Sequence, residues 1–129
     1  MAHPNETSLR AAYAAFAAGD LAGYLQYCSD GITFHVPGKG KAAGTFTRDQ
    51  FFAPFISNVM ELTDGTFRET VNDVVANDGR GVVLATHEFE RNGQTYKYET
   101  AHLYRIRDGK LETFEERPAD QYYFDEAWG

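Results

Sequence analysis

The sequence predicts an α+β domain in which three helices come first and an antiparallel sheet follows. Apolar residues recur every three or four positions over residues 8–28 and again over residues 51–62, the spacing of one buried helix face. From Thr66 onward apolar and polar residues alternate, as they do in strands. Three turn signals divide this second half into four strands: Asn77-Asp78-Gly79, Asn92-Gly93 and Asp108-Gly109.

The helical half is predicted to contain three segments. The first helix begins near Ser8, and Asp20 then caps a short second helix. A strand follows over residues 32–36 and ends at a glycine-rich loop. The third helix begins at Thr47, because the spacing between Thr47 and Gln50 is that of a capping box.

The Asn92-Gly93 turn predicts how the two long strands around it pair. A two-residue hairpin pairs Arg91 with Gln94, Glu88 with Lys97, His87 with Tyr98, and Val83 with His102. Opposite charges then meet on one face, and the two histidines lie among apolar and aromatic residues on the other. Because both faces are consistent with this register, we expect it in the folded chain.

The strand after that turn carries the main functional signal. Every second side chain is aromatic, aliphatic or polar enough for chemistry, and this inward set is Tyr96, Tyr98, Thr100, His102, Tyr104 and Ile106. A histidine among phenols on a buried face predicts a pocket for a small apolar or aromatic molecule. The other side chains expected to line the pocket are Tyr13, Phe16, Tyr24, Phe34, Phe55 and His87.

Charge and composition exclude several classes of function. The net charge is −7, so a phosphate backbone would be repelled and we expect no nucleic-acid partner. No apolar run approaches the roughly 20 residues that span a bilayer, and the N-terminus lacks the apolar core of a signal peptide. We therefore expect no membrane partner and a cytoplasmic location, in agreement with a single cysteine, Cys28.

The sequence carries no signature of a cofactor or a metal site. His87 and His102 share a face, but the predicted register separates them by four residues, about 13 Å at about 3.3 Å per residue. That separation predicts that they do not share one metal ion. No other pair of histidines has metal-ligand spacing, and no glycine-rich nucleotide loop is present. We expect neither a metal nor a cofactor.

Several short segments resemble the SnoaL-like proteins of the nuclear transport factor 2-like superfamily. They are Ala12-Tyr13-Ala14-Ala15-Phe16, Gly19-Asp20-Leu21, Phe34-His35-Val36-Pro37-Gly38, Ala43-Gly44-Thr45-Phe46 and Ile106-Arg107-Asp108-Gly109-Lys110-Leu111. The resemblance covers about Leu9 to Trp128 and implies a single SnoaL-like domain over residues 1–129. It implies a cone, in which a curved, mostly antiparallel sheet wraps around three N-terminal helices, and a homodimer through the outer face of the sheet.

The resemblance also implies site residues. Ketosteroid isomerase-like members have an aspartate base after the first strand and a protonated aspartate donor on the penultimate strand, and the matching positions here are His35 and His102. Their tyrosine donor falls one residue from Tyr13. The apolar pattern of residues 32–36 turns His35 away from the pocket, whereas the resemblance turns it inward, so both directions stay open.

A second resemblance concerns the strand after the Asp108-Gly109 turn. SnoaL-like cyclases use an acidic residue there as acid or base, and the matching position is Glu116. A regular hairpin would instead put Glu115 opposite His102 on the pocket face, and a bulge in either strand would reverse that choice. Both glutamates are therefore candidates.

Two functions follow as hypotheses. The first is a cofactor-independent enzyme of the isomerase, cyclase or dehydratase type that acts on a small apolar carbonyl compound. His102 would take or give the proton, His35 would be a second acid or base, and Glu115 or Glu116 would balance the charge. The second hypothesis is a ligand-binding or dimeric accessory protein whose pocket performs no chemistry.

Overall fold

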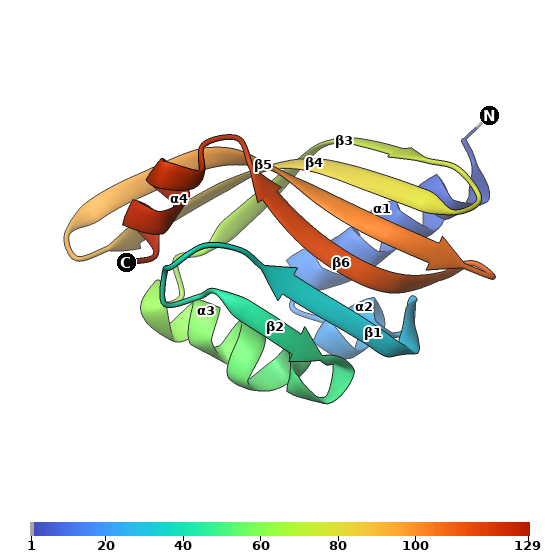
Figure 1. Ribbon diagram of the computed structural model, residues 1–129, viewed down its shortest axis with the longest axis horizontal. Helices are drawn as coiled ribbons and strands as arrows, with labels where there is room; N and C mark the ends of the chain where they lie inside the picture. The colour runs from blue at the N-terminus through green and yellow to red at the C-terminus, as the bar shows by residue number, and fades with distance from the viewer. Residues whose placement is uncertain (1) are drawn as a thin grey trace.

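The computed structural model describes residues 2–129 and has the predicted α+β architecture (Figure 1). Its first half contains α1 (Pro4–Ala17), α2 (Leu21–Leu25), β1 (Cys28–Val36), β2 (Gly44–Thr47), the helical turns η1 (Arg48–Gln50) and η2 (Phe51–Ile56), and α3 (Ser57–Leu62). Its second half contains β3 (Arg68–Ala76), β4 (Arg80–Arg91), β5 (Gln94–Arg107), β6 (Lys110–Pro118) and α4 (Gln121–Ala127).

The strands of the described chain form one curved sheet in the order β2-β1-β6-β5-β4-β3. Neighbouring strands are antiparallel except β1 and β6, which run parallel. Helix α1 packs against β3 and β4, and α2 packs against β1, so the helices lie on the concave side of the sheet (Figure 1). The predicted mostly antiparallel sheet around N-terminal helices is confirmed.

The predicted register of β4 and β5 is also confirmed. All four expected pairs are present, including His87 with Tyr98 and Val83 with His102. Asn92 has φ 51° and Gly93 has φ 76°, the left-handed pair of a two-residue turn whose twist matches that of the strands. Because side chains alternate along a strand, this register places both histidines on the concave face.

A bulge between β5 and β6 decides which glutamate faces inward. Next to the turn Ile106 pairs with Leu111, but from Arg105 onward the pairing is shifted by one residue. His102 therefore pairs with Glu116, and not with Glu115 as a regular hairpin would require. One extra residue in β6 moves every following side chain to the opposite face.

The first helix and the first strand begin earlier than predicted. Helix α1 begins at Pro4, since proline is favourable at the first helical position, and the His3 ring accepts a hydrogen bond from the Asn5 N–H at 3.0 Å. Strand β1 begins at Cys28, where it already pairs with Leu111 of β6. Parallel pairing with a distant segment is not visible in local sequence patterns.

The third helix begins as predicted but is interrupted. The Thr47 N–H donates to Gln50 Oε1 at 2.9 Å, as a capping box requires. Ala53 then has extended angles, φ −149° and ψ 130°, because Pro54 follows it and disfavours the helical conformation. The expected loop over residues 38–44 leads directly into β2, a short strand that the sequence pattern did not reveal.

Large side chains fill the space between the helices and the concave face. The fully buried ones come from every layer and include Leu9, Phe34, Phe89, Tyr104 and Phe124. Each contributes about 1.5–3 kcal/mol by leaving water. This packing surrounds the polar groups of the concave face with apolar walls.

The homodimer stays a prediction, and the outer face of the sheet provides its test. Leu84 and Val75 are 44% and 55% exposed there, and exposed apolar side chains favour association. We expect light scattering after gel filtration to give twice the chain mass of 14.5 kDa. Leu84→Glu should lower this mass toward that of one chain, whereas Tyr122→Glu, at a 90% exposed position on α4, should not. A monomeric unmodified chain would exclude the dimer.

Candidate functional site

A cavity of about 70 Å³ lies between the concave face of the sheet and the helices. A water molecule needs roughly 10–15 Å³ of such volume, so the cavity has room for several waters or a small organic molecule. Its wall includes Tyr13, Phe16, Tyr24, Phe34, Phe55, His87, Tyr98, His102, Tyr104 and Glu116. These are side chains that the sequence assigned to a pocket, and their role in binding stays a prediction.

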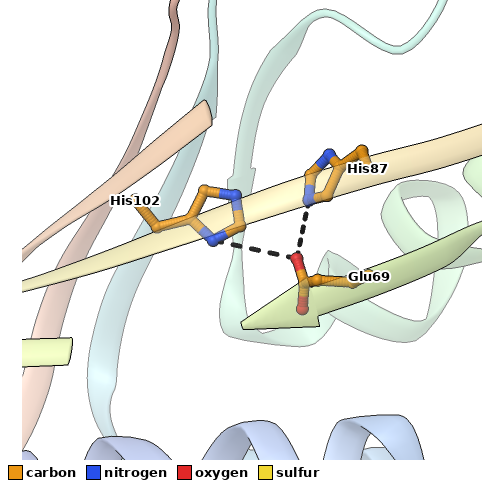
Figure 2. Close-up of side chains that lie close together, drawn as sticks. All are labelled: Glu69, His87 and His102. Carbon is orange, nitrogen blue, oxygen red and sulfur yellow. Dashed lines mark hydrogen bonds and ion pairs between the residues drawn. The ribbon is translucent and has the colours of Figure 1, made fainter. Parts of the chain in front are cut away.

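Four titratable side chains from four neighbouring strands meet on the wall of this cavity. They are Glu69 of β3, His87 of β4, His102 of β5 and Glu116 of β6. The pairs Glu69 with His87 and His102 with Glu116 are in register across the sheet. Their side chains are between 4% and 12% exposed, and both imidazole rings turn toward the Glu69 carboxylate (Figure 2). We call them the four-residue cluster.

Each imidazole of the cluster lies between the two carboxylates. The His87 Nε2 atom is 2.7 Å from Glu69 Oε2, and its Nδ1 atom is 3.5 Å from Glu116 Oε2. The His102 Nδ1 atom is 3.9 Å from Glu69 Oε2, and its Nε2 atom is 3.4 Å from Glu116 Oε2. Two buried negative charges are therefore placed against two groups that accept protons, which offsets the cost of removing them from water.

Three tyrosine hydroxyls continue this network from His102. The Tyr13 hydroxyl is 2.6 Å from His102 Nδ1 and 2.6 Å from the Tyr104 hydroxyl, which is 2.8 Å from the Tyr24 hydroxyl. Each hydroxyl has one proton. When Nδ1 accepts, all three protons point toward His102, and when Nδ1–H donates, all three point toward Tyr24. The protonation of His102 is thus coupled to the direction of the whole chain.

The other ring nitrogen of His102 has no such partner. Its Nε2 atom is buried and makes no hydrogen bond with any group of residues 2–129. Glu116 Oε2, at 3.4 Å, is near enough for an ion pair, but the two groups are not in hydrogen-bonding geometry. A buried polar atom without a partner costs about 1–3 kcal/mol. Such atoms occur where a ligand or a catalytic function compensates for that cost.

Charge pairing sets the protonation of the cluster. Burial alone would raise the pKa of Glu116 and of Glu69, but the neighbouring histidines outweigh it and lower the pKa of both carboxyls. Burial alone would lower the pKa of His102, but Glu116 and Glu69 outweigh it and raise the pKa of this ring. Both carboxylates are therefore ionised near neutral pH, and His102 tends to hold its proton.

The tyrosines around the cluster remain proton donors. Burial raises the pKa of Tyr13, Tyr24, Tyr98 and Tyr104 well above the ordinary value. The Tyr98 hydroxyl accepts a hydrogen bond from Trp128 Nε1 at 3.0 Å and is 3.0 Å from His87 Nδ1. The tyrosines therefore fix the two histidine rings without adding negative charge.

The sequence analysis missed Glu69 and misjudged the distance between the two histidines. The centroids of the His87 and His102 rings are 5.3 Å apart, because the concave curvature brings their tips together although their backbone positions are separated. One ligand atom each from Glu69, His87 and His102 lies within 4.8 Å of the others. The inference that the histidines are too far apart for one metal ion was therefore wrong. The register of β3 with β4 would have revealed Glu69.

Two of the four catalytic candidates lie outside the cavity. The exposed His35 ring points away from the pocket, with Nδ1 2.8 Å from Thr45 Oγ1 of the outer hairpin. Glu115 is on the opposite face of β6 from Glu116 and forms an exposed ion pair with Arg117 at 2.8 Å. The strand pattern of residues 32–36 was right about His35, and the resemblance was not. Neither residue reaches a ligand in the cavity.

Known proteins give the chain a family. The model of the SnoaL-like domain matches residues 9–113. The chain belongs to the SnoaL-like domain family. An uncharacterised protein of Mycobacterium tuberculosis is 29% identical over 121 residues, which cover 93% of this chain and 92% of that protein. The family predicted from the short segments is confirmed.

Solved structures agree with this assignment. Bal32a, from a soil-derived mobile gene cassette, is 27% identical with a TM-score of 0.88 over 98% of this chain and 97% of its own. TerC, co-crystallised with polyporic acid, is 26% identical with a TM-score of 0.83 over 97% and 98%. A nuclear transport factor 2-like protein of Burkholderia pseudomallei, 24% identical with a TM-score of 0.84 over 98% of both chains, has the same fold. Within residues 2–129, no helix has the length and apolarity needed to cross a membrane.

The pKa shifts predict how stability depends on pH. The pKa of Glu116 is lowered from 4.5, so its contribution is present above pH 4.5 and is lost as the pH falls through the lowered value. The pKa of His102 is raised from 6.5, so its contribution is complete below pH 6.5 and is lost as the pH rises through the raised value. The contribution of this pair is therefore largest between these two ordinary values.

Urea unfolding in the presence of a chelator measures this dependence. We expect the free energy of unfolding to decline on both sides of the window, and the alkaline decline to be absent in His102→Gln. His35→Gln is the matched control, because that ring is exposed and outside the cluster, and its profile should equal that of the unmodified chain. An alkaline decline that persists in His102→Gln would assign it to other groups.

Proposed function

We propose that the cavity binds a small, mostly apolar carbonyl compound and that the four-residue cluster transfers a proton on it, as in an isomerisation, cyclisation or dehydration. The observation that carries the proposal is the Nε2 atom of His102, which is buried on the cavity wall without a hydrogen-bond partner in residues 2–129. A carbonyl oxygen of the ligand would be that partner.

The cluster contains both the acid and the base that such a transfer needs. His102 would give its Nε2 proton to the carbonyl oxygen while Glu69 takes a proton from the neighbouring carbon. Return of the proton to a different carbon, and loss of the proton from the oxygen, complete an isomerisation with no co-reactant. Both histidine contacts of Glu69 use Oε2 (Figure 2), which leaves Oε1 for the substrate. Glu116 would balance the charge of the protonated ring.

The remaining cavity wall favours an apolar body on the ligand. Away from the cluster and the tyrosines it is formed by aliphatic and aromatic side chains, among them Val36, Phe51, Phe55, Ile56 and Val59. Polar groups on one wall and apolar groups on the others orient a ligand that has a single polar end. TerC, co-crystallised with polyporic acid, supports a small organic ligand in a chain of this shape.

A binding protein without chemistry is the second candidate. The free volume of about 70 Å³ favours it, because pockets that hold substrates of ordinary size are about 300–1,000 Å³. A ligand larger than a few atoms would have to displace side chains of the wall. The two candidates differ in whether the cluster changes a bound ligand.

Substitution of His102 separates the candidates. Cyclic and α,β-unsaturated ketones would first be screened for a rise in melting temperature, and bound compounds would be followed by NMR for exchange of the α-hydrogens with deuterium. With a chelator present, we expect His102→Gln to slow this exchange about 10²–10⁴-fold, while His35→Gln leaves it unchanged. Exchange that survives His102→Gln unchanged would remove His102 from the mechanism. Binding without any exchange would support the second candidate.

A further inference from the structure

We propose that Glu69, His87 and His102 form a binding site for a divalent transition-metal ion such as zinc or cobalt. One ligand atom from each of the three residues lies within 4.8 Å of the others. Two imidazoles and one carboxylate are a donor set for zinc, iron and cobalt, with the remaining positions open for water or substrate. This inference goes beyond the proposed function, which requires no metal.

The distances need only a small adjustment to suit an ion. Ligands at about 2.0–2.1 Å around a tetrahedral ion are about 3.3 Å from one another. The His87 Nε2 atom is now 2.7 Å from Glu69 Oε2, and the His102 Nδ1 atom is 3.9 Å from it. One distance therefore lengthens and the other shortens by about 0.6 Å each, which rotation of the Glu69 side chain can provide.

Glu116 holds both rings in the orientation that a metal requires. Its Oε2 atom is 3.5 Å from His87 Nδ1 and 3.4 Å from His102 Nε2, the two ring nitrogens that face away from the proposed ion. Histidines that bind metals almost always direct their second nitrogen to a carboxylate, a carbonyl or water. Thr100 Oγ1 in turn donates to Glu116 Oε2 at 3.0 Å. The outer partners of a metal site are thus present.

Charge balance favours the same occupant. Two ionised carboxylates carry a charge of −2, and one divalent ion with two neutral imidazoles brings the four-residue cluster to zero. A buried cluster with unbalanced charge is costly, so a divalent ion suits this site better than a monovalent ion. The one competing contact is the Tyr13 hydroxyl, 2.6 Å from the His102 Nδ1 atom that would bind the ion. Tyr13 would keep its hydrogen bond to Tyr104.

Titration of the chelator-treated chain with cobalt(II) and zinc tests the proposal. We expect saturable binding of one ion per chain, seen as the visible absorption of cobalt(II) in a nitrogen and oxygen site and as heat on addition of zinc. Glu69→Gln and His87→Gln should each weaken binding on the order of 100-fold or more, and Glu116→Gln about 10–100-fold. Tyr13→Phe keeps every ligand and removes the competing hydroxyl, so it should bind as tightly as the unmodified chain or more tightly.

Two exposed histidines provide the controls. His35→Gln and His3→Ala should leave affinity unchanged, because neither ring is part of the cluster, although His3 lies 2.7 Å from Asp78 at the surface. No saturable binding, binding that survives both Glu69→Gln and His87→Gln, or binding that is lost in His3→Ala would each overturn the proposal. The titration contains no organic ligand, so its failure leaves the proposed proton transfer, tested with a chelator present, unaffected.

Discussion

The pairing of two buried carboxylates with two imidazoles is the interaction on which the site depends. Each ion alone would lose several kcal/mol on transfer from water to the interior, and their mutual contacts offset that cost only if the geometry is kept. Removal of one member leaves its partner buried and unbalanced. The cluster is therefore expected to be lost or retained as a unit, in contrast to the exposed pair of Glu115 and Arg117.

That dependence makes the register of the sheet a functional property. The cluster takes one residue from each of β3, β4, β5 and β6, so four strands must be aligned to within one residue. A slip of one position would turn a carboxylate or an imidazole to the outer face. The bulge between β5 and β6 is such a one-residue shift, and it determines that Glu116 and not Glu115 completes the cluster.

Features encoded by neighbouring residues were predictable, and features that depend on curvature were not. The Asn92-Gly93 turn fixed the β4–β5 pairing, because turn geometry is local. The bulge depends on how three strands fit together, and no residue of β6 announces it. The proximity of the two imidazoles depends on the concavity of the sheet, which a spacing of about 3.3 Å per residue along a flat strand ignores.

Glu69 was missed for a related reason, and it changes the chemistry available to the site. A pocket with His102 and Glu116 alone offers one acid paired with one carboxylate. The second carboxylate and His87 double the charge to be balanced, and a dry cluster of this kind reaches neutrality either with a proton on each imidazole or with one divalent ion. Protons and a metal ion would then compete for the same nitrogens, and the Tyr13 hydroxyl on His102 Nδ1 favours the protonated state.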